Sequence, residues 1–155
     1  MSGIFGNVES VFDDDGPTYA VLMMSDITTK KGRDEHIYKF IRKSVPSDTK
    51  ALALAYSTLK KKNDMEVFIY KNQGNTYEEQ YSKLIYRVIK NAKGEIIAVT
   101  YIRDKKRTEE WAKNGRRDVK VNTCIGSPAY LIDEKGHKTK TANPFKENPK
   151  YKDWI

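Results

Sequence analysis

One stretch of the sequence, residues 18–27, limits the fold of the chain more than any other. It reads TYAVLMMSDI, a nearly continuous apolar run of strand length. Such a run is typical of a buried central strand, although periodicity alone is also compatible with a helix. The preceding run Asp13-Asp14-Asp15-Gly16-Pro17 favours a turn or loop, and residues 28–33 read as a basic loop. We therefore expect a sheet with residues 18–27 at its centre.

Two consecutive segments after that strand have the spacing of amphipathic helices. In residues 34–43 the apolar side chains recur at i, i+3 and i+4, with acids at the start and bases at the end, as the helix dipole favours. Pro46 closes this segment, and Ser47 is a good N-cap for a second helix through about Lys62. The apolar positions are Ile37, Phe40 and Ile41 in the first helix, and Leu52, Ala55, Tyr56 and Leu59 in the second.

The remaining apolar segments favour strands. Residues 65–71 and 95–102 are rich in β-branched and aromatic side chains, and residues 129–140 have the pattern of a hairpin turning at 133–136. Residues 4–12 and 119–125 have weaker strand composition. Residues 76–90 support two interpretations. Thr76 and Glu79 form a capping box for a helix, whereas residues 81–90 and the turn at 91–94 indicate the first strand of a hairpin, which we favour.

These elements together predict an α+β fold. We expect a single domain over residues 1–142, with a largely antiparallel sheet and two consecutive helices at about 34–43 and 47–62. At 155 residues the chain is long enough to bury a real core. From residue 143 the chain is polar and contains two prolines, so residues 143–155 are expected to form a loosely held tail.

Charge is distributed unevenly along the chain. The net charge is +8, yet residues 1–29 contain five acids and no Lys or Arg, so the chain from Lys30 onward carries an excess of +13. An excess of this size favours nucleic acid, or an acidic protein surface, as the partner. The alternative is a surface charged for solubility alone.

The single cysteine and the two histidines exclude several classes of site. Cys124 alone cannot form an internal disulfide, and no spacing to His36 or His137 suggests a catalytic or zinc site. No phosphate-loop, dinucleotide or metalloprotease motif occurs, and we expect no catalytic residue, metal or cofactor. The sequence has neither a signal peptide nor an apolar run long enough to span a membrane, which predicts a soluble, cytoplasmic protein with a nucleoid or nuclear association as an option.

The densest positive charge lies in the segment 101–120, YIRDKKRTEEWAKNGRRDVK, with Trp111 at its centre. Cations around an aromatic ring suit a polyanion whose bases can stack. A second basic group lies in residues 30–33. The predicted nucleic-acid-binding residues are Arg103, Lys105, Lys106, Arg107, Trp111, Arg116, Arg117, Lys30, Lys31 and Arg33. Tyrosines in predicted strands are candidates for base stacking or for half-buried packing, namely Tyr70, Tyr86, Tyr101 and Tyr130.

The sequence therefore predicts a small, basic, non-enzymatic protein that binds DNA or RNA mainly through phosphates, in a regulatory or architectural role. Two alternatives stay open. The first is a protein-interaction module, an inhibitor or adaptor that docks on an acidic surface of a larger machine. The second is a metal-dependent nuclease that would gather Asp26 and the aspartates at 13–15 around Mg²⁺.

Overall fold

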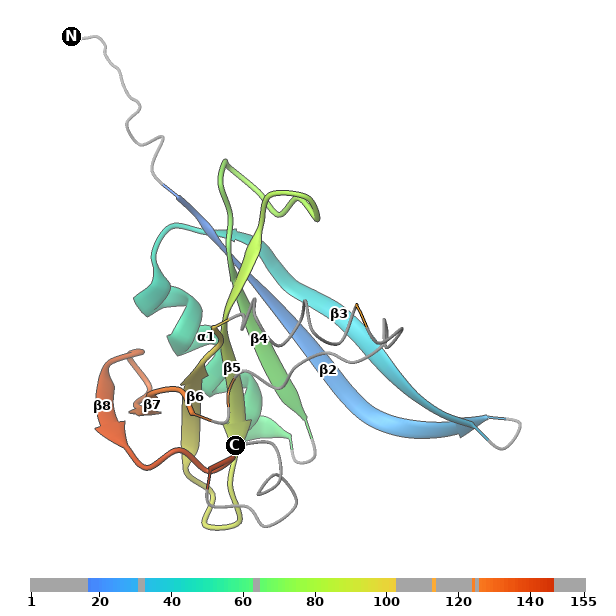
Figure 1. Ribbon diagram of the computed structural model, residues 1–155, viewed down its shortest axis with the longest axis vertical. Helices are drawn as coiled ribbons and strands as arrows, with labels where there is room; N and C mark the ends of the chain where they lie inside the picture. The colour runs from blue at the N-terminus through green and yellow to red at the C-terminus, as the bar shows by residue number, and fades with distance from the viewer. Residues whose placement is uncertain are drawn as a thin grey trace, which may run out of the picture.

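A computed structural model describes residues 17–30, 33–62, 65–102, 113, 124 and 126–146, without the side chains of residues 26–36. Within these residues the chain forms one seven-stranded sheet and one helix, α1 (Figure 1). Every neighbouring pair of strands is antiparallel. The elements in chain order are β2 (Tyr19–Lys30), β3 (Arg33–Val45), α1 (Asp48–Lys61), β4 (Glu66–Lys71), β5 (Lys83–Lys90), β6 (Ile96–Thr100), β7 (Ala129–Ile132) and β8 (Lys138–Thr141).

The strands lie in the order β3-β2-β4-β5-β6-β7-β8, so β3 and β8 are the outermost strands. From β4 to β8 each strand pairs with the next along the chain. The connections β5–β6 and β7–β8 are short, at residues 91–95 and 133–137, whereas residues 101–128 separate β6 from β7. The connection through α1 is the exception, because it carries the chain from β3 past β2 to β4. This crossover places α1 on one face of the sheet.

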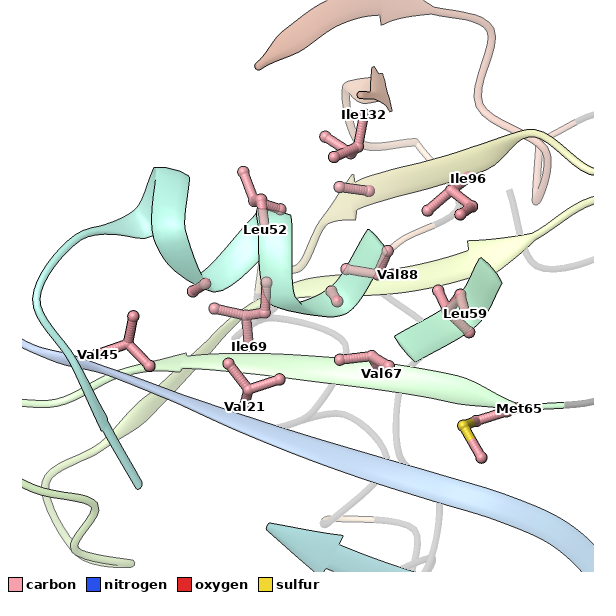
Figure 2. Packing of buried hydrophobic residues seen from close by; sticks show 13 residues of the cluster. Val21, Val45, Leu52, Leu59, Met65, Val67, Ile69, Val88, Ile96 and Ile132 are labelled. Atoms are coloured by element: carbon pink, nitrogen blue, oxygen red, sulfur yellow. The ribbon is translucent and has the colours of Figure 1, made fainter. Parts of the chain in front are cut away.

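The helix forms where the sequence predicts it. The Ser47 side chain accepts a hydrogen bond from the Lys50 amide at 3.2 Å, which satisfies one of the free N–H groups of the first turn. The buried residues of α1 pack against strand residues that alternate toward them, including Val67 and Ile69 of β4 and Val88 of β5 (Figure 2). This cluster is the main core, and its labelled members come from β2, β3, α1, β4, β5, β6 and β7.

The prediction of a first helix at residues 34–43 is wrong, and with it the fold class that had two consecutive helices. These residues belong to β3, a 13-residue strand that pairs with β2 from Val45 to Arg33. The ladder with β2 satisfies the backbone groups that a helix would satisfy internally, and tertiary pairing overrides a weak local helix preference. The expected basic loop at 28–33 is also wrong in its bounds, because β2 continues to Lys30 and β3 begins at Arg33.

Several strand predictions are confirmed. Residues 83–90 and 96–100 form the β5–β6 hairpin, so the helix suggested by the capping box at Thr76 does not form. The strands at 66–71 and 129–132, and the hairpin of β7 with β8, also agree with expectation. The strands expected at 4–12 and 119–125 lie outside the described residues, apart from Cys124 in the second.

The beginning of the expected C-terminal tail contacts the sheet. Phe145 is 6% exposed and packs with Val99 and Ala129 in a second apolar cluster on the face away from α1. The Asn143 side chain anchors this turn by accepting from the Phe145 amide at 2.8 Å and donating to the Ser127 carbonyl at 2.6 Å. Residues 147–155 lie outside the described residues, so the predicted domain boundary stays a prediction.

The β2–β3 hairpin reaches beyond the rest of the sheet (Figure 1). Strand β2 pairs with β4 only from Tyr19 to Met24, whereas its pairing with β3 continues to Lys30. The part of β2 beyond Met24 spans roughly 20 Å at about 3.3 Å per residue. We call the paired residues 25–30 and 33–37 the ribbon. No helix in the described part of the chain is long and apolar enough to cross a membrane.

Candidate nucleic-acid interface

The structure places few of the predicted nucleic-acid-binding residues. Lys30 and Arg33 are opposite each other at the end of the ribbon, where their backbones form the last described pair of β2 and β3. Their side chains are not described, and Lys31 lies outside the described residues. We call the basic segment that begins at Arg103 and ends at Lys120 the basic tract. Its predicted nucleic-acid-binding residues also lie outside the described residues, namely Arg103, Lys105, Lys106, Arg107, Trp111, Arg116 and Arg117.

Strand register identifies an aromatic surface on the face of the sheet opposite α1. Phe40 of β3, Leu22 of β2 and Phe68 of β4 occupy directly opposed positions in neighbouring strands. Opposed residues of antiparallel strands project from the same face. Val21 and Val67, one position away from Leu22 and Phe68, pack under α1, so Phe40 and Phe68 project from the other face.

Further rings adjoin this row. Tyr38 lies two residues before Phe40 in β3 and is 58% exposed. The ring of Tyr77, from the loop between β4 and β5, lies 4.6 Å from Phe40 and 5.2 Å from Tyr70, measured between ring centroids. Together with Tyr101, which follows β6, these residues form what we call the aromatic surface: Tyr38, Phe40, Tyr70, Tyr77 and Tyr101.

The phenol of Tyr70 is partly buried and has other phenols near it. Burial, followed by the neighbouring phenols of Tyr77, Tyr101 and Tyr38, raises the pKa of Tyr70 to about 12. A phenolate at Tyr70 would be poorly solvated and would face other phenols, so the neutral form is favoured. Tyr70 therefore remains a neutral, half-buried ring at physiological pH.

A buried amide holds the loop that carries Tyr77. Asn72 is 1% exposed; its Nδ2 donates to the Thr18 Oγ1 and to the Lys43 carbonyl, each at 3.0 Å. Its Oδ1 accepts from the Ser82 hydroxyl at 2.8 Å. The Tyr77 amide donates to the same Lys43 carbonyl at 3.1 Å. The Asn72 side chain thus joins the segments at the start of β2, the end of β3 and the start of β5. Because the Tyr77 amide binds the same carbonyl, these bonds fix the position at which the Tyr77 ring contacts Phe40.

Cationic groups lie at the margin of the aromatic surface. The Lys43 ammonium lies 5.4 Å from the centroid of the Phe40 ring, within the range of a cation–π interaction. Tyr101 neighbours Tyr70 electrostatically, and the sequence enters the basic tract two residues later, after the exposed Ile102.

An ion pair lies on the same face of the sheet next to the second apolar cluster, against which Tyr101 of the aromatic surface also packs. The Arg87 guanidinium donates from Nε to the Glu66 Oε1 at 2.8 Å and from Nη2 to Oε2 at 3.1 Å. It also lies 4.7 Å from the centroid of the Phe145 ring. Arg87 is opposed to Phe68 of β4 and to Val99 of β6, so this ion pair lies between the phenylalanine of β4 and the second apolar cluster.

The four tyrosines predicted as stacking candidates do not lie together. Tyr70 and Tyr101 belong to the aromatic surface, whereas Tyr86 and Tyr130 project under α1 and pack against the main core. There the Lys138 ammonium donates to the Tyr86 hydroxyl at 2.8 Å and lies 5.2 Å from the centroids of both rings. The hydrogen bond to Tyr86 raises the pKa of Lys138, and Tyr86 and Tyr130 serve as packing residues.

Sequence reasoning missed Tyr38, Phe40 and Tyr77 as members of a site. The spacing of Tyr38 and Phe40 at i and i+2 was the available signal, because alternate residues of a strand share a face. The helical interpretation of residues 34–43 concealed it. Tyr77 carries no local signal, since its position depends on Asn72 and on the distant strand β3.

The described residues give no support to metal or thiol chemistry. Among them no three His, Cys, Asp or Glu side chains are grouped so as to hold a metal ion. The aspartates at 13–15, and the side chain of Asp26, lie outside what the structure describes, so the nuclease alternative is untested. Burial raises the pKa of the Cys124 thiol to about 11 and keeps it protonated at neutral pH.

Comparison with known proteins gives no family to assign: no family model, curated protein or solved structure matches this chain.

Proposed function

We propose that this protein binds nucleic acid, DNA or RNA, mainly through the phosphates, and acts as a binding protein rather than an enzyme. The observation that supports this most strongly is the pair of basic positions at the end of the ribbon. The ribbon ends in the opposed positions Lys30 and Arg33, and the sequence of the basic tract begins two residues after Tyr101. Tyr38 of the aromatic surface lies at the base of this ribbon, and Tyr101 of the same surface precedes the basic tract in the sequence.

The ribbon suits contact with a polyanion because of its reach. Tyr38 lies in β3 at the base of the ribbon, and Arg33 lies five positions away, roughly 17 Å along the strand. Cations held at that distance from a sheet surface contact phosphates several nucleotides away from those near Lys43. A two-stranded β-ribbon is also narrow enough to enter the major groove of a duplex.

The charge of the chain supports the same partner. The excess of +13 after residue 29 provides an electrostatic attraction that depends little on sequence. Each phosphate neutralised by Lys or Arg releases counterions, so the logarithm of the affinity falls with the logarithm of the salt concentration. The slope is about −0.9 per contact for duplex DNA and about −0.7 for single strands.

The test is a titration of labelled duplex DNA, single-stranded DNA and RNA, followed by fluorescence anisotropy at several salt concentrations. We expect a slope that corresponds to several phosphate contacts. Replacing Lys30, Lys31 and Arg33 together by Ala should reduce the affinity at least tenfold at about 100 mM salt and make the slope shallower by about two. Replacing Arg103, Lys105, Lys106 and Arg107 by Ala should weaken binding similarly.

A matched control removes the same charge elsewhere. The variant with Lys60, Lys61 and Lys62 replaced by Ala also loses three positive charges, from exposed positions at the end of α1. It should bind within about threefold of the wild-type protein, because only long-range attraction is lost. Equal losses in the two triple variants would contradict a localised site. No binding even at low salt would refute the proposal, and protein capture with this chain as bait would then test the adaptor alternative.

A further inference from the structure

We propose that the aromatic surface binds single-stranded nucleic acid, whose bases stack on Tyr38 and on the rings beside it. This inference rests on the proposed function, which it narrows from nucleic acid in general to strands with unpaired bases. It follows from the geometry of the rings, whereas the proposed function follows from charge, so the two can fail separately.

The two rings of β3 have a spacing that suits an extended strand. Residues 38, 39 and 40 pair in regular register with Met24, Met23 and Leu22, between two irregular segments of the ladder. Tyr38 and Phe40 therefore project from one face, roughly 6.6 Å apart along the strand. Bases of a single strand splay apart to stack on successive aromatic rings, which they cannot do while paired in a duplex.

The rings are held in place before any ligand binds. Phe40 contacts Tyr77, Tyr77 contacts Tyr70 edge to face at 79°, and the Asn72 amide fixes the loop of Tyr77. A stacking platform that is already ordered loses little conformational entropy when a base settles on it. Tyr38 is the most accessible ring of the group, at 58% exposed, and is therefore the first candidate for direct stacking.

Charge selects the occupant of this surface. The Lys43 ammonium lies over the Phe40 ring of the aromatic surface, the ribbon that starts beside Tyr38 ends in Lys30 and Arg33, and the sequence that follows Tyr101 is basic. An apolar protein partner would gain nothing from these cations and would leave them desolvated, whereas the phosphates of a bound strand would neutralise them. Aromatic rings flanked by cations are the arrangement that recurs in proteins that bind single strands.

The experiment compares three variants on one single-stranded oligonucleotide and on the duplex of the same sequence. Tyr38→Ala should weaken single-strand binding by about five- to a hundredfold, the range measured for loss of one stacked base. It should leave the salt slope and the duplex affinity unchanged within about twofold. Tyr38→Phe retains the ring and should bind the single strand as the wild-type protein does.

The matched control is Tyr81→Ala. Tyr81 is 54% exposed, close to the exposure of Tyr38, but lies in the loop between β4 and β5 instead of in a strand. It should bind the single strand within twofold of the wild-type protein. Circular dichroism of each variant establishes that the fold is intact.

The outcomes separate the two proposals. If the wild-type protein binds duplex with a steep salt slope, and Tyr38→Ala binds the single strand normally, this inference is overturned and the proposed function stands. An equal loss in Tyr38→Ala and Tyr81→Ala also overturns it. If the wild-type protein binds neither single strand nor duplex, both fail together.

Discussion

Asn72 joins three segments that meet beside the aromatic surface, so replacing it by Ala tests how the fold supports the site. The side chain makes three hydrogen bonds, to Thr18, Lys43 and Ser82, and is 1% exposed. A net hydrogen bond contributes about 1 kcal/mol to stability. Three such bonds contribute about 3 kcal/mol. The loss on replacement is somewhat smaller, because the Lys43 carbonyl still accepts a hydrogen bond from the Tyr77 amide. We expect Asn72→Ala to lower the free energy of unfolding by about 2–3 kcal/mol.

Asn91 provides a matched control in the turn between β5 and β6. Its side chain also makes three hydrogen bonds, donating to the Glu95 carboxylate at 2.9 Å and accepting from the amides of Lys93 at 3.0 Å and Glu95 at 2.9 Å. These bonds are exposed, so water replaces the lost partner and Asn91→Ala should cost about 1 kcal/mol or less.

The assay is urea unfolding monitored by circular dichroism for the two variants and the wild-type protein. If the m-values of the three proteins are equal, differences between their midpoints report differences in the free energy of unfolding. Asn72→Ala should cost at least about 1 kcal/mol more than Asn91→Ala. Equal costs would show that burial of the amide contributes nothing. Because the Asn72 side chain helps to hold the loop that carries Tyr77, Asn72→Ala should also weaken single-strand binding, whereas Asn91→Ala should not.

Three further predictions concern other parts of the molecule. Gly136 has φ of 83°, and a Cβ there would overlap the Thr49 carbonyl at the start of α1. Gly136→Ala should therefore lower the free energy of unfolding by about 1–3 kcal/mol in urea titrations, and Gly94→Ala, at φ of 81° in open space, by less. Cys124 is fully buried, so its reaction with Ellman's reagent at pH 8 should be on the order of a hundredfold slower than in urea, and equal rates would contradict its burial. The pKa of Tyr70 is about 12 in the folded protein and 10.0 in an unfolded chain, so the unfolded chain loses the phenol proton first as the pH rises. The free energy of unfolding should therefore fall between pH 10 and pH 12, and it should fall less steeply in Tyr70→Phe.

The parts of the fold that local chemistry determines could be predicted from the sequence. The N-cap at Ser47 and the stripe ending at Leu59 define α1 without reference to other segments. The hairpin turns at 91–94 and 133–136 end in Gly94 and Gly136, which adopt positive φ as such turns require. These signals are short in range, and the structure agrees with them.

Strand β3 could not be recognised from the sequence, because its apolar and polar residues do not alternate regularly. Register shifts interrupt the pairing of β3 with β2, so apolar residues fall at 37, 40 and 41 instead of at every second position. That spacing matches a helix face as well as a bulged strand. Only the partner strand β2 decides between them, and its pairing is not encoded locally.

The aromatic surface depends on still longer-range order. Its row of Phe40, Leu22 and Phe68 exists only because β2 lies between β3 and β4, an order set by the crossover through α1. The sequence indicated basic segments and tyrosines in strands, yet it could not assign Tyr70 and Tyr130 to opposite faces. The class of partner that composition suggests stays a prediction, whereas topology determines which rings share a surface.

The most direct test of the account is aromatic NMR of the protein during titration with a short single-stranded oligonucleotide. Tyrosines lie on both faces of the sheet in the described part of the chain, so one titration reports on both faces at once. We predict that the ring signals of Tyr38 and Tyr77 shift with saturation, while those of Tyr56 on α1 and of Tyr130 beneath it stay unchanged. Shifts confined to Tyr56 and Tyr130, or none at all in the presence of excess oligonucleotide, would contradict the assignment of this surface.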